Sequence, residues 1–468
     1  MDSRSYSHMY CTGRNIVNKR KYPELHRHFT EHGRLSKNLC NAALFRLRQN
    51  FTARGKDALT ANEKEVLSEI DMTMQMSGKA RPAAVMSYSF LEKLMRVTGN
   101  PDFFAGLPMQ TSQQLLKKEV QDFRDWLAAL RAWKRDHSGF TGKPGMPKYL
   151  KCEMTTIIYT NQDCVIYRDD GHCFLKFPGT KIRLEIQPLP EDAVLREVKV
   201  KPHYGDFEVL YTYECLAPES RSDLCYAAAI DLGVDNIAAI ATNEGHSLIV
   251  KGGAVKAANQ WYNKQRARLV SELTKGHTTA AKPESKRLTA LSENRDHFML
   301  DACHQISRRI VDFCLRCRIA TLYIGYNRAW KQQSSMGRKN NQNFVAIPLA
   351  MLRGMITYKA ERAGIRVILQ EESYTSQASF ADSDYIPSYG MDDDRAVFSG
   401  RRVTRGLYRT ADGTVVNADL NAAANILRKA KQDAFQDVKD IGFLKNPEVI
   451  YYTGLHDKRD PVKGTAAA

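Results

Sequence analysis

The pattern of apolar and polar positions divides the chain into three regions. From 24 to 137, apolar residues recur three and four positions apart, as in LSKNLCNAALFRLRQNF and TSQQLLKKEVQDFRDWLAALRAWKRD, which predicts a helical segment. From 138 to 222, a Gly- and Pro-rich stretch leads into short β-rich runs such as TTIIYT and FEVLYTYEC, which favour a small antiparallel barrel or sandwich. From 223 onward, strand-like runs alternate with helical ones, including a long helical block near 255–316. We therefore expect an α+β multidomain protein.

Composition supports a folded chain of more than one domain. Its 468 residues correspond to roughly two to four domains of about 100–200 residues each. Hydrophobic residues make up 43% and charged residues 26%, close to globular averages, which excludes wholesale disorder. No apolar run is long enough to predict a membrane-spanning helix, and the N-terminus has no apolar signal region. The ten scattered cysteines are typical of reduced thiols in a cytoplasmic protein.

The charge points to a polyanionic partner. The chain has 69 Lys and Arg against 52 Asp and Glu, a net charge of +17, and the excess is concentrated in 1–50 and 251–287. Either segment alone is typical of a solvated helix face, but the two together favour contact with a phosphate backbone. In the second segment aromatic residues interleave with cations, which suits stacking on bases, although a half-buried amphipathic helix has the same pattern. The candidate nucleic-acid contacts are Lys251, Lys256, Trp261, Lys264, Arg266, Arg268 and Lys331.

Acidic residues stand at three places where a carboxylate can do chemistry. Asp231 follows the apolar run of YAAAIDLGVDNIAAIAT, where a buried carboxylate is costly unless it is paired or binds a metal; capping of a strand end or turn is the ordinary alternative. Asp419 begins an apolar helix in VVNADLNAAANILRKA, a place where Asp is also a favoured N-cap. Glu371 and Glu372 end the run VILQEE and, taken alone, resemble solvated carboxylates.

Together these acids indicate a metal-dependent nuclease. Two acids from strand ends and one from a helix start are the set that a two-metal site requires. Mg²⁺ takes oxygen ligands in octahedral geometry and uses few protein carboxylates. Two such ions, about 3.5–4 Å apart, activate water and stabilise the leaving oxygen of a phosphodiester. No Ser-His-Asp pattern and no Walker-type phosphate loop competes with this interpretation.

The same residues carry a family resemblance. AIDLGVDNIAAIAT resembles the first motif of the RuvC/RNase H nucleases in the transposon-encoded TnpB family and in the compact type V CRISPR effectors descended from it. NADLNAAANIL resembles their third motif, and ESYTSQ resembles the Thr-Ser segment that opens their target-nucleic-acid-binding insert. The order and spacing match across 225–432, whereas the N-terminal half fits more loosely. The resemblance implies that Asp231 bridges two Mg²⁺ ions, with Asp419 and a middle Glu each completing one.

Two departures from the family pattern matter. The strand ATLYIGYN has Gly325 where the family places its middle Glu. In relatives such as the eukaryotic Fanzor proteins this Glu stands just before the Thr-Ser segment, so Glu372 is the expected ligand and Glu371 the alternative. The family's insert normally carries a CxxC…CxxC zinc ribbon, but residues 318–468 contain no Cys, and Ser379 stands near one expected ligand. We therefore expect no zinc, and an insert that folds without metal around FSGRRVTRGLYRT.

The resemblance also implies a domain order. It consists of a wedge barrel at 1–23 and 138–222, a helical recognition lobe at 24–137, a RuvC-like (RNase H-like α/β) nuclease domain at 223–373 and 417–442, a target-nucleic-acid-binding insert at 374–416, and a C-terminal tail at 443–468.

The implied function is an RNA-guided DNA endonuclease that cuts beside a short flanking motif, using Mg²⁺ or Mn²⁺ held by Asp231, Glu372 and Asp419. The implied partners are a guide RNA and target double-stranded DNA with its displaced strand, but no membrane. The protein would act as a monomer or a dimer on the RNA, in a prokaryotic cytoplasm near the nucleoid. Two alternatives stay open: a nuclease-dead RNA-guided DNA-binding repressor, suggested by Gly325, and a guide-independent RNase H-like transposase or resolvase.

Overall fold

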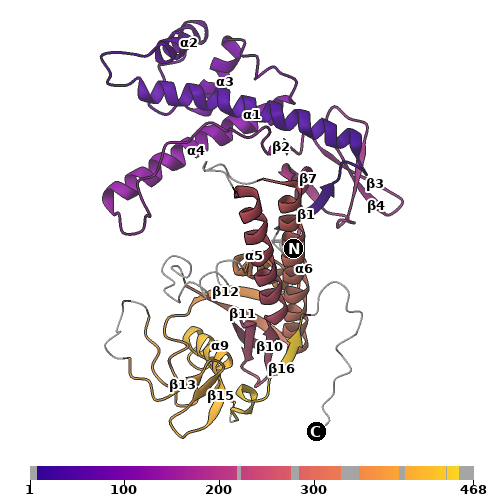
Figure 1. Cartoon of the computed structure of the whole chain (residues 1–468), viewed down its shortest axis with the longest axis vertical. Helices are drawn as coiled ribbons and strands as arrows, with labels where there is room; N and C mark the ends of the chain where they lie inside the picture. The colour runs from indigo at the N-terminus through magenta and orange to yellow at the C-terminus, as the bar shows by residue number, and fades with distance from the viewer. Residues whose placement is uncertain are drawn as a thin grey trace, which may run out of the picture. The chain divides into compact units, whose positions relative to one another are not determined.

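The chain folds into two compact mixed α/β units. The computed structural model describes residues 8–218, 223–275, 284–327, 347–388, 390, 396–438 and 440–452. The units are Met1–Ala217, coloured indigo to magenta in Figure 1, and Pro218–Ala468. Each unit buries hydrophobic clusters of its own. Across the described residues, no helix combines the length and the apolar character that crossing a bilayer requires.

The strands of the N-terminal unit form two antiparallel sheets over one hydrophobic cluster. The alternation in FEVLYTYEC puts every second residue inside, and Tyr211 is fully buried. Tyr211 lies opposite Gly13, where any Cβ would come within 2.1 Å of the Tyr211 ring, so only glycine fits there. The larger sheet has the order β1 (His8–Val17), β7 (Asp206–Leu216), β6 (Val194–His203), β2 (Ile157–Thr160), and the smaller one β3 (Val165–Asp169), β4 (His172–Lys176), β5 (Arg183–Ile186).

Four helices stand between β1 and β2 in the sequence and share a second cluster. Their apolar stripes meet there; Leu39 and Leu47 of the first helix and Leu116 of the last are fully buried or nearly so. Thr60 and Glu63 form a reciprocal capping box that fixes the start of the second helix. The helices are α1 (Pro23–Thr52), α2 (Ala61–Ser77), α3 (Tyr88–Val97) and α4 (Met109–Arg135).

The C-terminal unit is built on a six-stranded mixed sheet in the order β12-β11-β8-β9-β10-β16. The strands are β8 (Tyr226–Asp231), β9 (Asn236–Thr242), β10 (Ser247–Lys251), β11 (Ile319–Tyr326), β12 (Arg366–Glu371) and β16 (Glu448–Tyr451). β8 runs parallel to β11, and β11 runs parallel to β12, whereas β9 is antiparallel to both β8 and β10. β16 comes from the segment predicted to be a C-terminal tail, and it pairs parallel with β10.

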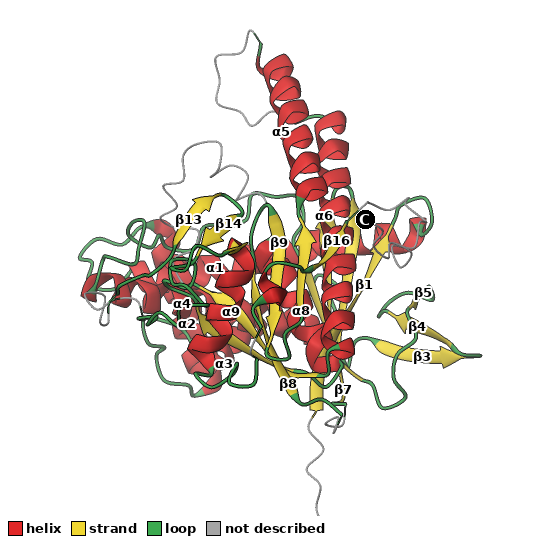
Figure 2. Cartoon of the chain, turned by 90° about the horizontal axis from the view of Figure 1, so that it is seen from below, coloured by secondary structure: helices red, strands yellow, loops and turns green. Residues whose placement is uncertain are grey.

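Helices cover both faces of this sheet (Figure 2). The predicted helical block near 255–316 is two helices, α5 (Gly253–Thr274) and α6 (Lys286–Arg316). On one face, Ala228 and Ile230 pack with α6 and α8 (Leu349–Arg362); on the other, Ala227 and Ala229 pack with α9 (Ala418–Ala430). Burial on both faces explains why β8 is a continuous apolar run rather than an alternating one.

The insert between β12 and α9 contains a small antiparallel sheet, β13 (Arg401–Thr404), β14 (Leu407–Arg409) and β15 (Val415–Asn417). Gly400 lies under Tyr408, at a position where a Cβ would come within 2.5 Å of the ring. The Tyr408 hydroxyl donates a 2.7 Å hydrogen bond to the Gln377 carbonyl. This packing ties the two ends of the insert to each other.

Candidate active site

The predicted acids come together at one edge of the C-terminal sheet. Because β8, β11 and β12 are parallel, their carboxyl ends share an edge, and Asp231 and Glu371 are the last residues of β8 and β12. Ile230 faces α6 and α8, so the alternation of the strand turns Asp231 toward α9. Asp419 stands in the first turn of α9.

Glu372 occupies the space above Gly325. A Cβ built on Gly325 would lie 2.3 Å from Glu372 Oε2 and 2.9 Å from the Ile426 side chain. Ile324, one residue earlier, pairs with Ile230, so Gly325 stands beside the end of β8. The missing side chain on β11 therefore leaves room for a carboxylate that arrives from the neighbouring strand.

Glu371 has a different environment from Glu372. Its Oε2 accepts a 2.5 Å hydrogen bond from Lys429 Nζ, and its Oε1 accepts one of 2.7 Å from the Ser373 N–H. Burial opposes ionisation of Glu371, but these hydrogen bonds outweigh it and lower its pKa. Glu371 is thus committed to an ion pair, which leaves Glu372 as the carboxylate available at the edge.

Asp419 is not the N-cap of its helix. Asn417 holds that position, and its side-chain oxygen accepts the Asp419 and Leu420 N–H groups at 3.0 and 3.1 Å. The Asp419 carboxylate has other partners. Its Oδ2 accepts a 2.7 Å hydrogen bond from Asn236 Nδ2, and its Oδ1 accepts one of 2.9 Å from the guanidinium of Arg402. The N-cap alternative for Asp419 is therefore wrong.

Negative charge at the edge is poorly compensated. Burial raises the pKa of Asp231 well above its usual range, and the charges of Glu372 and Asp419 add to this, with Arg402 opposing. Burial, reinforced by Glu371, raises the pKa of Glu372 to about 7. Among the described residues, neither the Asp231 nor the Glu372 side chain has a hydrogen-bond or ion-pair partner.

The chemistry of these donors fits hard divalent cations. Asp231, Glu372 and Asp419 offer only oxygen ligands, and a cation would offset the burial and the neighbouring negative charges that raise the pKa values of Asp231 and Glu372. In the described part of the chain, however, no three His, Cys, Asp or Glu side chains are gathered closely enough to hold one ion.

Two buried asparagines of α9 shape the site; the sequence pointed to Asn421, either to orient Asp419 or to cap the helix, and sequence reasoning missed Asn425. Asn421 accepts a 3.0 Å hydrogen bond from the Phe380 N–H and donates one of 2.8 Å to the Ala378 carbonyl. Asn425, one turn later, donates to Thr375 and Ala378 carbonyls at 2.9 and 2.7 Å. Asn421 thus neither orients Asp419 nor caps the helix; it fixes the segment that follows Glu372. A buried polar pair at i and i+4 in an apolar helix was the available signal.

The predicted basic contacts have mixed environments. Lys251 donates 3.0 Å to Asn236, and Lys256 forms a 2.6 Å ion pair with Asp235. Trp261 is 58% exposed on α5, and Arg268 pairs with Glu272 one turn away. Lys264 and Arg266 are also exposed on α5, whereas Lys331 lies outside the described residues.

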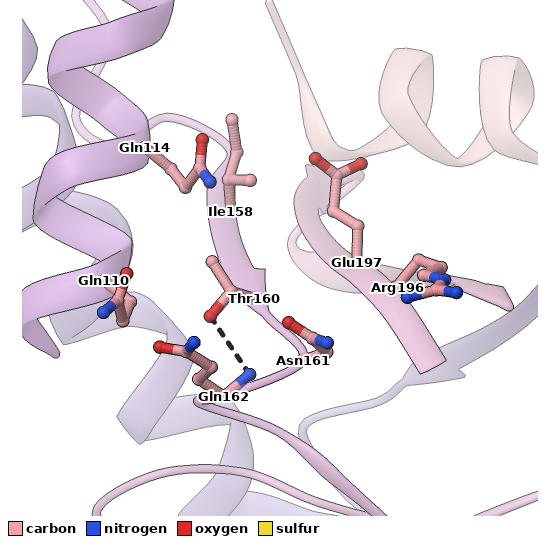
Figure 3. A pocket seen from close by; sticks show the side chains of 8 residues that line it. All are labelled: Gln110, Gln114, Ile158, Thr160, Asn161, Gln162, Arg196 and Glu197. Carbon is pink, nitrogen blue, oxygen red and sulfur yellow. Dashed lines mark hydrogen bonds between the residues drawn. The ribbon is translucent and has the colours of Figure 1, made fainter. Parts of the chain in front are cut away.

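The N-terminal unit has a polar pocket of its own (Figure 3). It is lined by Gln110 and Gln114 of α4, Ile158 and Thr160 of β2, the turn residues Asn161 and Gln162, and Arg196 and Glu197 of β6. The four amide side chains have no hydrogen-bond partner among the described residues. Arg196 is anchored by Glu214, whose Oε2 accepts its Nε–H at 2.8 Å. Free amides and an anchored guanidinium are groups that pair with the edges of nucleic-acid bases.

A solved structure and two protein-family models resemble parts of this chain. The fold resembles a Cas12f1 chain in the solved Cas12f1-sgRNA-target DNA complex, with a TM-score of 0.50, 14% identity, and coverage of 87% of this chain and 84% of that one. Residues 211–331 match a family described as a probable transposase (OrfB_IS605), and residues 350–426 match the Cas12f1-like TNB domain.

Two curated proteins are similar to this chain. The CRISPR-associated endodeoxyribonuclease Cas12f2 of a Micrarchaeota archaeon is 22% identical over 53% of this chain, and the TnpB-like protein ORF457 of Acidianus two-tailed virus is 24% identical over 51%. The alignments span 44% and 47% of those proteins, less than half of each. With the two family matches, they show that this chain is similar to TnpB proteins and compact type V CRISPR effectors, the resemblance that its motifs predicted.

Proposed function

We propose that this protein is an RNA-guided DNA endonuclease whose active centre is formed by Asp231, Glu372 and Asp419. The observation that carries the proposal is the Glu372 carboxylate above Gly325, in electrostatic contact with Asp231. A chain that had lost catalysis would have no reason to keep Asp231 and Glu372, which have no hydrogen-bond or ion-pair partner among the described residues, beside Asp419 at one sheet edge, because a half-buried carboxylate without a partner is costly. The names of the relatives, an endodeoxyribonuclease and a TnpB-like protein, support the same activity.

The sheet topology supports an RNase H-like, RuvC-type nuclease domain. Counted along the C-terminal unit, its first five strands lie in the order 3-2-1-4-5 with only the second antiparallel to its neighbours. This order puts the first strand at the centre and Asp231 at its carboxyl end, beside β11. In open α/β sheets that edge is where ligands bind.

The chain's own residues hold and orient the reacting groups. Asp231, Glu372 and Asp419 would bind the divalent cations, while Lys429 keeps Glu371 out of the set. Bound there, Mg²⁺ or Mn²⁺ would activate the attacking water and stabilise the leaving oxygen. Asn421 and Asn425 hold the segment after Glu372 against α9. These bonds fix the position of the Glu372 backbone relative to that of Asp419.

The proposed partners are a guide RNA and target double-stranded DNA with its displaced strand. A solved relative of the same fold is a complex with sgRNA and target DNA, and the net charge of +17 suits such a partner. The amide-lined pocket of Figure 3 is our candidate for reading the flanking motif. Cleavage of a library of flanking sequences tests this: we expect one preferred motif, and equal cleavage of all of them would contradict it.

One experiment tests the function as a whole. The full chain is expressed with its native flanking DNA, the copurifying RNA is sequenced, and DNA that matches the variable end of that RNA is assayed for cleavage in Mg²⁺. We expect one discrete RNA and specific cleavage. Asp231→Ala should lower cleavage at least about a thousandfold, since loss of metal-ion stabilisation is worth several kcal/mol. It should leave the RNA bound, and Asp312→Ala on α6 should change neither.

Other outcomes separate the alternatives. Specific DNA binding without cleavage would favour the nuclease-dead repressor. Cleavage that needs no RNA would favour a guide-independent transposase or resolvase. Heterogeneous RNA that moderate salt removes would overturn RNA guidance altogether.

A further inference from the structure

The two oxygens of Asp419 are held from two different parts of the C-terminal unit. Oδ1 faces Arg402 on the exposed hairpin of the insert. Oδ2 faces Asn236 at the start of β9, and Asn236 in turn accepts a 3.0 Å hydrogen bond from Lys251 at the end of β10. Lys251, Asn236 and Asp419 therefore form a chain of hydrogen bonds that begins on the central sheet.

The donors and acceptors of this hydrogen-bond chain fix the direction of the Asn236 amide. A lysine ammonium only donates and a carboxylate only accepts, so both bonds form only when Oδ1 faces Lys251 and Nδ2 faces Asp419. The opposite rotamer would place a donor against a donor and an acceptor against an acceptor. Lys251 thus selects the amide orientation that donates to Asp419.

The backbone holds Asn236 and Lys251 rigidly; we call the Lys251–Asn236–Asp419 chain of hydrogen bonds the relay. A shift in the register of β9 and β10 between Val250 and Lys251 brings Lys251 opposite Asn236. The next residue, Gly252, packs against the β8–β9 turn, where a Cβ would come within 2.6 Å of the Val234 carbonyl oxygen. Its N–H donates 2.8 Å to the Asp235 carbonyl. Asn236 and Lys251 therefore hold their places relative to Asp231 and Asp419.

We infer that Asn236 and Lys251 are positioning residues, which orient the Asp419 carboxylate as a metal ligand. The inference rests on the proposed function. The Asn236 amide between Lys251 and Asp419 supports this role. A lysine in direct contact with Asp419 would compete with the cation, whereas an amide donates a hydrogen bond without adding charge at the ligand. This role differs from the direct nucleic-acid contact predicted for Lys251.

Binding of Mn²⁺ alone to the full chain, measured by electron paramagnetic resonance without nucleic acid, tests the relay. Asn236→Ala should raise the dissociation constant of the Asp231-dependent site about ten- to a hundredfold, the usual effect of losing a hydrogen bond to a ligand. Lys251→Met should raise it by a smaller factor, and Lys251→Arg should restore most of the affinity. Because the residues act in series, the double variant should bind no more weakly than Asn236→Ala.

Arg402→Gln is the matched control, since it removes the bond to the other oxygen of Asp419. Its Mn²⁺ affinity should stay equal or rise, because a competing cation is lost. Unchanged affinity in Asn236→Ala and Lys251→Met, or an equal loss in Arg402→Gln, would overturn the relay and leave the proposed function standing. Absence of Asp231-dependent binding in the unaltered chain would overturn the proposed active site, and the relay with it.

Discussion

Two groups of carboxylates in the C-terminal unit have opposite environments. The edge group consists of Asp231, Glu372 and Asp419. The insert group consists of Asp382 and Asp384, which sit among the hydroxyls and N–H groups of Ser379 and Ser399. Asp384 Oδ2 accepts the Ser379 and Ser399 N–H groups at 2.7 and 3.0 Å, and its Oδ1 accepts the Ser399 hydroxyl at 2.5 Å. Asp382 accepts the Ser379 hydroxyl at 2.5 Å and the Ala411 N–H at 2.9 Å.

The difference separates carboxylates that build the fold from carboxylates kept for a ligand. Asp384 is only 8% exposed, but its charge is met by three donors from two distant turns of the insert, so its burial is compensated. Asp231 and Glu372 are half-buried beside each other with raised pKa values, and neither side chain has a hydrogen-bond or ion-pair partner among the described residues. Carboxylates without partners have no structural benefit, which is why we assign function to Asp231 and Glu372, and with them to the neighbouring Asp419, and structure to the insert group.

Among the changes that test this comparison, the largest expected effect contrasts two adjacent glutamates. Glu372→Gln should lower cleavage by a few hundredfold, about 3 kcal/mol, because it removes a metal ligand without changing the shape of the site. Glu371→Gln should leave cleavage within a few-fold of the unaltered chain and lower the free energy of unfolding by about 1–2 kcal/mol, since Lys429 loses its charged partner. Cleavage rates and thermal unfolding measure the two effects. A reversed pattern would make Glu371 the ligand.

This contrast also shows how far sequence reasoning reached. Asp231, Asp419 and the choice of Glu372 over Glu371 came from local motifs and from a missing Glu at Gly325; their roles stay predictions. The partners of Asp419 did not come from the sequence. Asn236 and Asp419 are 183 residues apart, so no local pattern reports that they meet. The strand β16 was also missed: its short β-branched and aromatic run was assigned to a tail, and only pairing with the distant β10 places it in the sheet.

The fold of the insert was predicted only in part. The absence of cysteine allowed us to predict folding without zinc around FSGRRVTRGLYRT, and Ser379 was noted only as standing near an expected ligand position. Its actual partners, Asp382 and Asp384, were not identified, because Ser and Asp are common in loops and mark no particular contact.

The next largest effect tests the insert group. Asp384→Ala should lower the free energy of unfolding by about 2 kcal/mol, because it leaves the Ser379 and Ser399 N–H groups without acceptors. Hydrogen exchange should speed up around Ser379 and Ser399 and stay unchanged in β8 and β11. Asp412→Ala, which affects only the exposed turn between Thr410 and Thr414, is the matched control and should cost less.

Metal chelation gives a second test of what holds the insert together. If hydrogen bonds rather than a metal hold the insert, a strong zinc chelator should leave its exchange protection unchanged. Loss of protection in the unaltered chain on chelation would contradict the structural role that we give to Asp384.

The smallest effect concerns the space that Glu372 uses. Gly325→Ala adds a Cβ that would lie 2.3 Å from Glu372 Oε2, and the flexible end of the glutamate can move away more easily than the sheet backbone. We therefore expect a small loss of stability and about a tenfold lower cleavage rate, equivalent to about 1.4 kcal/mol, because the carboxylate is displaced rather than removed. Raising the Mg²⁺ concentration should recover part of the lost rate in Gly325→Ala and none in Glu372→Gln. If Gly325→Ala cleaves at the unaltered rate, the close fit of Glu372 over Gly325 has no catalytic meaning, and the contrast between the edge group and the insert group would rest on Asp231 alone.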